Sequence, residues 1–183
     1  MTVLEGTGVR LRPLVASDYP TIFGWYEDPE LVSPFDRYAP ETYDDFVRSV
    51  ETAGDDPTSL EPRFSIEEVS SGRLIGAVGH YVAHPVLEYI DVWYLLGDAA
   101  ARGHGYGREA VSLLVDHLFR TRSVERIGAT VDVENVPSNR LMVGLGFRLE
   151  GTLRSSLFHH GRWHDVQVYG LTRPEWASRH PQS

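Results

Sequence analysis

The sequence predicts one α/β domain built around a mixed β-sheet. A chain of 183 residues with 42% hydrophobic residues suits a single domain of ordinary size. Segments with strand and helix periodicity follow one another in the order β-α-α-β-β-β-α-β-α-β-β, and no linker, repeat or low-complexity stretch divides them. We therefore expect about seven strands and about four helices within residues 1–183.

The N-terminal region is expected to contain one strand and two helices. Residues 9–14 alternate apolar and basic side chains, as a half-buried strand does. Ser17 is a candidate cap for a helix over 19–26, in which apolar residues recur at helical spacing. The same spacing predicts a second helix over 43–50, followed by a polar loop at 54–62.

The rest of the chain is predicted to alternate strands with two helices. Short turns at 70–72 and around 160–161 indicate two hairpins. The tail from Pro174 offers little to bury. The expected strands are 63–69, 73–82, 87–96, 126–133, 147–157 and 163–171, and the expected helices are 106–118 and 137–143.

Composition excludes several classes of function. The chain has no cysteine, which excludes disulfides, thiolate metal sites and cysteine nucleophiles. A formal charge of −9 is unfavourable for binding nucleic acid. Apolar runs are too short to span a membrane, and residues 1–12 lack the features of a signal peptide. We expect a soluble, cytoplasmic protein with no metal, nucleic acid or membrane partner.

The charges are unevenly distributed along the chain. Residues 1–70 hold 15 acidic and 5 basic residues, whereas residues 71–183 hold 11 acidic and 12 basic ones. The acidic segment is either a solubilising surface or a surface that meets a cation. All 17 basic residues are arginine, so any cation that binds an anionic ligand here carries a planar, permanently charged guanidinium.

A glycine-rich turn precedes the most strongly amphipathic helix. Gly103, Gly105 and Gly107 alternate at the start of that helix, with Arg102 and Arg108 beside them. Unpaired N–H groups at a helix N-terminus favour phosphate or pyrophosphate. The absence of lysine excludes a P-loop, and the G-x-G-x-G spacing does not match the Rossmann fingerprint. A purely structural turn remains the alternative.

A second motif follows the next strand. Asn135 and Ser138 precede a short helix, and Gly146-Phe147 follow it. Together with Arg102, Gly105 and Gly107, these residues resemble the two signatures of the GCN5-related N-acetyltransferases (GNAT). The segments 161–171 and Glu175-Trp176 resemble the ribosomal-protein-alanine N-acetyltransferase-like (RimJ/RimL-type) subgroup. The resemblance covers about residues 9–176, which leaves a short tail at 177–183.

This resemblance implies a splayed central sheet and acetyl-CoA as cosubstrate. Pantetheine would lie between two separated strands, the glycine turn would hold the pyrophosphate, and no metal would take part. The oxyanion donor would be the backbone N–H of Leu95 or Leu96. The implied CoA-binding residues are Tyr94, Leu95, Leu96, Arg102, Gly103, His104, Gly105, Tyr106, Gly107, Arg108, Asn135, Ser138, Asn139 and Arg140.

The catalytic groups are less closely specified. Many relatives carry a tyrosine seven residues after the motif asparagine as the acid, but here that position is Met142. Ser138 is the nearest substitute, although its hydroxyl could equally cap the helix. Asp91 is either the general base or a paired structural carboxylate. Further candidates are Glu134 after the next strand and His159 and His160 at the last hairpin.

The acceptor is expected to be a primary amine. Because covalent relay through cysteine is excluded, direct attack in a ternary complex is favoured. A cationic small molecule drawn by the acidic segment is the first hypothesis; a protein N-terminus and a non-catalytic acyl-CoA-binding domain are the alternatives. The sequence leaves the oligomeric state open, including a homodimer. The candidate acceptor-binding residues are Trp25, Tyr26, Phe35, Tyr38 and Trp93.

Overall fold

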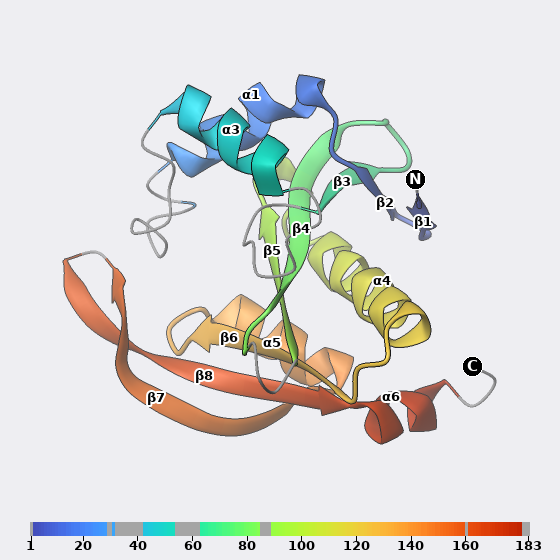
Figure 1. The fold of residues 1–183 in the computed structure, drawn as a ribbon, viewed down its shortest axis with the longest axis vertical. Coiled ribbons are helices and arrows are strands. Elements are labelled where there is room, and N and C mark those ends of the chain that lie inside the picture. The colour runs from blue at the N-terminus through green and yellow to red at the C-terminus, as the bar shows by residue number, and fades with distance from the viewer. Residues whose placement is uncertain are drawn as a thin grey trace.

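The computed structural model describes residues 2–28, 31, 42–53, 63–84, 89–159 and 161–180. They form one eight-stranded sheet in the order β1-β2-β3-β4-β5-β6-β8-β7, with helices on both faces (Figure 1). The strands are β1 (Leu4–Glu5), β2 (Val9–Pro13), β3 (Phe64–Glu68), β4 (Leu74–Val82), β5 (Ile90–Leu96), β6 (Arg126–Asp132), β7 (Arg148–His159) and β8 (Arg162–Thr172). The helices are α1 (Tyr19–Tyr26), α3 (Tyr43–Ala53), α4 (Tyr106–Thr121), α5 (Val136–Leu145) and α6 (Arg173–Arg179), with short 3₁₀ helices η1 (Ala16–Asp18) and η3 (Ala99–Ala101).

The sheet is antiparallel except at its centre. β5 and β6 are parallel neighbours, and α4 connects them. Parallel neighbours need a crossover connection of this kind, which explains the single long amphipathic helix between two strands. β7 and β8 form a long curved ribbon at the edge of the sheet (Figure 1).

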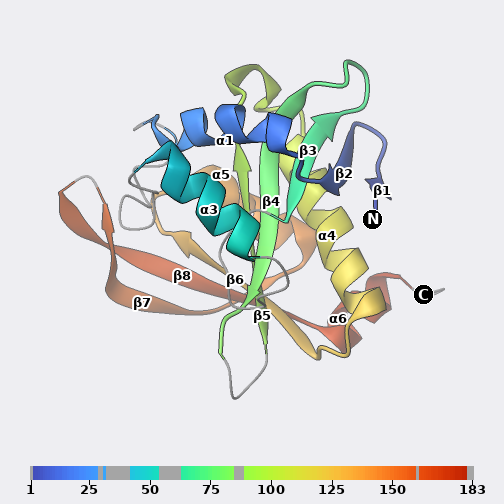
Figure 2. The same cartoon turned by 45° about the horizontal axis from the view of Figure 1, so that its top comes forward.

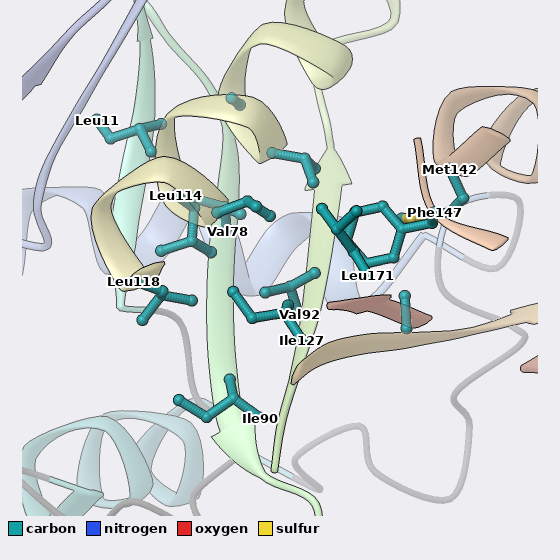
Figure 3. Close-up of a cluster of buried hydrophobic side chains, with 14 of the residues drawn as sticks. Leu11, Val78, Ile90, Val92, Leu114, Leu118, Ile127, Met142, Phe147 and Leu171 are labelled. Atoms are coloured by element: carbon teal, nitrogen blue, oxygen red, sulfur yellow. The ribbon is translucent and has the colours of Figure 1, made fainter. Parts of the chain in front are cut away.

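The two faces of the sheet carry two separate hydrophobic clusters. The larger one joins α4, α5 and α6 to the sheet and includes Leu114, Ile127 and Met142 (Figure 3). The smaller one lies under α1 and α3 and is centred on Ile22, Phe46 and Ala77. Figure 2 shows α1 and α3 together across one face of the sheet. Residues of β5 therefore point alternately to the α4/α5 face and to the α1/α3 face.

The predicted fold class is confirmed, and two counts are corrected. The sheet has eight strands rather than about seven, because the two-residue strand β1 is too short to show a periodic pattern. Five α-helices lie in the described ranges rather than about four. The additional one is α6, so the prediction that the tail from Pro174 buries little is wrong. Trp176 is 5% exposed and stacks on Phe119 at a centroid distance of 5.1 Å.

The predicted cap of the first helix is also wrong. Ser17 lies inside η1, and it is Asp18 that precedes α1. The Asp18 carboxylate accepts hydrogen bonds from the Val15 N–H at 3.1 Å and from the Ser65 hydroxyl at 2.7 Å, and it pairs with Arg12 at 2.7 Å. Arg12 and these hydrogen bonds hold the pKa of Asp18 below its ordinary value although burial opposes them.

No helix in the part of the chain that the structure describes is long and apolar enough to cross a bilayer. The predicted loop at 54–62 lies outside the described residues.

Candidate active site

The central strands β5 and β6 separate after two residue pairs. Ile90 pairs with Ile127 and Asp91 with Gly128, and no further β5–β6 pair is formed although both strands continue. The two strands therefore diverge and leave a gap in the hydrogen bonding of the sheet, with α4 following β5 and α5 following β6 (Figure 1). This is the splay that the family resemblance implied.

The hydrogen-bond pattern of β4 and β5 decides which backbone groups face this gap. The Ala83 N–H donates to the Tyr89 carbonyl at 2.9 Å, so by alternation Trp93 and Leu95 also bond to β4. A Cβ on Gly76, in β4, would collide with the carbonyl oxygen of Leu95. The Leu95 carbonyl therefore points toward β4, as the alternation requires. The free N–H and C=O groups that face the gap are therefore those of Tyr94 and Leu96. The backbone N–H of Leu95, one of the two predicted oxyanion donors, points to β4 and away from the gap.

The glycine turn lies at the open end of β5 and begins α4. Gly103 and Gly105 have φ values of +80° and +83°, a left-handed conformation that favours glycine, and a Cβ at either position would meet open space. The first helical bond runs from the Glu109 N–H to the Gly105 carbonyl. The N–H groups of the first turn of α4 consequently have no acceptor within the helix. These amide donors are flanked by Arg102 and His104, which are exposed.

The other predicted residues of this turn make contacts within the protein. The Tyr106 hydroxyl donates to Glu68 at 2.9 Å. Gly107 lies under the ring of Tyr94, since a Cβ there would come within 2.9 Å of the Cε2 atom of Tyr94. Arg108 donates to the carbonyl of Gly144, at the end of α5, at 2.9 Å. Gly107 thus has a packing reason to be glycine, whereas Gly105 has a conformational one.

The second motif builds the N-terminus of α5. The side-chain oxygen of Asn135 accepts from the Ser138 N–H at 3.2 Å and so caps the helix. The possibility that the Ser138 hydroxyl is the cap is therefore wrong; it lies 3.0 Å from the hydroxyl of Tyr94. Asn139 donates to the carbonyl of Asp132 at 2.9 Å and accepts from the Tyr169 hydroxyl at 2.9 Å. Arg140 is exposed.

Asp91 is buried at the closed end of the gap, on the α1/α3 face. Its nearest cation is Arg126, whose Nη1 lies 3.9 Å from Oδ1, and in the described structure that Oδ1 has no hydrogen-bond partner. Burial raises the pKa of Asp91 to about 6, and the charge of Arg126 only partly opposes this. Gly128 leaves the room that the carboxylate occupies, since a Cβ there would collide with Oδ1.

Glu134 is half exposed, and both of its carboxylate oxygens accept a hydrogen bond from Arg162, at 2.7 and 2.8 Å. The same carboxylate lies 3.7 Å from the Nδ1 of His164, and the role of Glu134 as a catalytic group stays a prediction. His160 lies outside the described residues. Of His159 only the backbone is described; it pairs with Arg162 across the β7–β8 hairpin.

Two of the five predicted acceptor-binding residues, Phe35 and Tyr38, lie outside the described residues. Trp25 packs directly against Gly97, at the end of β5, because a Cβ on Gly97 would enter the indole ring. Trp93 lies on the same face as Asp91 and packs on Gly79. Tyr26 contacts Phe46 at a ring-centroid distance of 5.8 Å and belongs to the smaller core cluster.

One buried polar residue was missed by sequence reasoning. His164, in β8, has a side chain only 2% exposed, and its Nδ1 lies 3.0 Å from a carboxylate oxygen of Asp132. It alternates with Val166 and Val168 on the strand, and this pattern could have placed it on an inner face.

Comparison with known proteins decides the family. A family model described as "Acetyltransferase (GNAT) domain" matches residues 9–148, more than half of the chain. The chain belongs to the GNAT acetyltransferase family. Within this family it is a RimJ/RimL-like N-acetyltransferase that depends on acetyl-CoA.

Individual relatives of this GNAT enzyme act on different acceptors. This chain is 31% identical over 180 residues to the uncharacterized N-acetyltransferase p20 of Bacillus licheniformis, and the match covers 97% of this chain and 99% of p20. The Vibrio cholerae spermidine N-acetyltransferase in complex with CoA and spermine has the same fold, with a TM-score of 0.82, 22% identity and coverage of 93% and 99% of the two chains. The ribosomal-protein-S5-alanine acetyltransferase of Vibrio fischeri has a TM-score of 0.76, 22% identity and coverage of 96% and 99%.

Proposed function

We propose that this GNAT enzyme transfers the acetyl group of acetyl-CoA to a primary amine on a cationic small molecule, by direct attack in a ternary complex. The observation that carries the proposal is the separation of β5 from β6 after Asp91, with the glycine turn at its open end. Pantetheine would lie along the gap against the backbone groups of Tyr94 and Leu96. The pyrophosphate would accept from the first-turn N–H groups of α4, beside the charge of Arg102.

The residues at the closed end of the gap fit direct attack by an amine. An alkylamine with an ordinary pKa near about 10 must lose a proton before or during attack. Asp91 is ionised above its pKa of about 6 and is therefore a base at neutral pH, directly or through one water. The oxyanion of the tetrahedral intermediate would accept from the backbone N–H of Leu96 or Tyr94, fixed donors that need no reorganisation.

The acceptor side of the site is rich in carboxylates. Asp91 and Asp132 lie on β5 and β6 on the α1/α3 face, and α3 carries Asp44, Asp45 and Glu51. Part of this charge is offset within the protein, because Arg126 lies 3.9 Å from Asp91 and Arg48 pairs with Asp45 at 2.9 Å. Acidic surroundings raise the local concentration of a cationic acceptor and favour it over a neutral one.

Matched pairs of amines test the acceptor. Acetyl-CoA is supplied with a polyamine, with the monoamine of the same chain length, and with peptides that have basic or acidic N-terminal segments, while thiol release is followed. We expect a kcat/KM for the polyamine at least about tenfold above that for the monoamine, with the difference shrinking as salt screens the charges. Turnover with the peptides alone would favour a protein N-terminal acetyltransferase. CoA binding without turnover on any acceptor would favour an acyl-CoA-binding module.

A further inference from the structure

The phenol of Tyr94 reaches from β5 to the helix that follows β6. Its side chain lies on the α4/α5 face and packs against the large core cluster. Its ring covers Gly107, at the start of α4, and its hydroxyl lies 3.0 Å from the Ser138 Oγ at the start of α5. The two hydroxyls therefore join the two walls of the gap on this face.

The position of Tyr94 along the gap follows from the strand register. The last β5–β6 pair is Asp91 with Gly128, and Tyr94 comes three residues later, where the strands no longer bond. Asp91 and Tyr94 are an odd number of residues apart and lie on opposite faces of β5. A group held in the gap would thus have a carboxylate on the α1/α3 face and a phenol on the α4/α5 face.

The thiolate that leaves a thioester must be protonated or stabilised as the carbon–sulfur bond breaks. Among the described side chains at this wall of the gap, Met142 has no proton to give, and the arginines do not release theirs. The Ser138 hydroxyl can donate a hydrogen bond, but an aliphatic alcohol is a much weaker acid than a phenol. The amide of Asn139 is engaged with the Asp132 carbonyl. Burial raises the pKa of Tyr94 above its ordinary value, which keeps the phenol protonated at neutral pH.

We propose that Tyr94 protonates the departing CoA thiolate and that Ser138 is the positioning residue that holds its hydroxyl at the gap; this rests on the proposed binding of CoA there. As the amine nitrogen forms its bond to the carbonyl carbon, the carbon–sulfur bond breaks and its electron pair stays on sulfur. The phenol proton moves to sulfur, and the phenolate recovers through solvent the proton that the amine has given to the base. The net products are the N-acetylated amine and CoA.

Tyr94→Phe removes the hydroxyl and keeps the ring over Gly107. General acid catalysis contributes about 10²–10⁴-fold, so we expect kcat to fall at least about 100-fold. The dissociation constant of desulfo-CoA, which lacks the sulfur, should not change. Ultraviolet titration of bound CoA should give a thiol pKa that is higher in the variant than in the parent, because the hydrogen bond to the thiolate is lost. Tyr19→Phe, which removes a half-buried phenol hydroxyl from α1, is the control and should keep the parent kcat.

Ser138→Ala distinguishes the role of the serine hydroxyl from that of the tyrosine hydroxyl. It breaks the contact with Tyr94 but leaves the phenol, so it should cost less than about tenfold in kcat. A loss in Ser138→Ala that equals or exceeds the loss in Tyr94→Phe would overturn the assignment, as would an unchanged kcat and an unchanged thiol pKa in Tyr94→Phe. If the parent bound neither CoA nor desulfo-CoA, the proposed placement of CoA would fail instead.

Discussion

Asp91→Asn removes the negative charge of the proposed base but keeps a side chain of nearly the same size and shape. Asparagine occupies the same space above Gly128, and Arg126 keeps its contacts with Glu150 and with the Tyr169 carbonyl. The fold should therefore persist. The substitution removes both the proton acceptor and the buried group whose pKa is raised.

The loss of the base and the loss of the buried carboxyl each have an expected magnitude, the first in turnover and the second in stability. Loss of a general base costs about 10²–10⁴-fold in turnover, and the acid limb of the kcat/KM profile, expected at a pKa of about 6, should disappear. Because one pKa unit corresponds to about 1.4 kcal/mol, the difference between about 6 and the ordinary 3.8 corresponds to about 3 kcal/mol. A raised carboxyl pKa means that the folded parent binds the proton more tightly than the unfolded chain. The parent therefore loses this stability as the pH rises from about 4 to about 6, and the variant does not.

The assay is urea unfolding of both proteins at about pH 4 and about pH 7, combined with pH–rate profiles. The free energy of unfolding of the variant, minus that of the parent, should increase by about 2 kcal/mol between the two pH values, because at pH 4 the unfolded carboxyl is already partly protonated. Affinity for acetyl-CoA should change little. A stability difference independent of pH would refute the raised pKa, and an unchanged acid limb in the variant would remove Asp91 as the base.

Three further predictions concern the turn, the C-terminal helix and the amines of the chain. Gly105→Asp should weaken CoA binding more than about tenfold, because it puts a negative charge at the phosphates; Gly105→Asn carries a similar backbone strain without the charge, and equal losses in the two would count against a phosphate site. Trp176→Ala should destabilise the protein by about 3–5 kcal/mol in chemical unfolding, since it removes the stack on Phe119 and the hydrogen bond to Asp116; a cost below about 1 kcal/mol would mean that α6 is not part of the core. Because the chain has no lysine, prolonged incubation with acetyl-CoA should add at most one N-linked acetyl group by intact mass, and two stable groups would contradict this.

Periodicity in the sequence was sufficient to predict the long elements. α4, β3 and β4 bury whole faces, so their spacing is visible in the sequence, and the splay was implied by the two motifs around Gly105 and Asn135. β1 and α6 were missed because two strand residues and a seven-residue helix carry too few positions for a pattern. The start of α6 does carry a local signal, the capping box of Thr172 and Glu175 with Pro174 in the first turn, which was overlooked. The burial of the helix depends on a tertiary contact, the stack of Trp176 on Phe119.

Side-chain roles in the site were harder to predict than its location. The motif residues Asn135 and Ser138 were found, but the sequence could not tell that asparagine is the cap and that the serine hydroxyl reaches Tyr94 across the gap. Leu95 and Leu96 look equivalent in the sequence, yet the strand register turns only Leu96 toward the gap. The buried pair of His164 and Asp132 joins two strands far apart in the chain, and only their register brings them together.

Direct transfer in a ternary complex is tested most directly by a two-substrate kinetic matrix combined with a search for an early burst of thiol. The account predicts intersecting lines, one N-acetylated amine for each CoA thiol released, and no stoichiometric thiol release without an acceptor. Parallel lines with a burst of thiol in the absence of amine would show an acyl-enzyme intermediate and would contradict it.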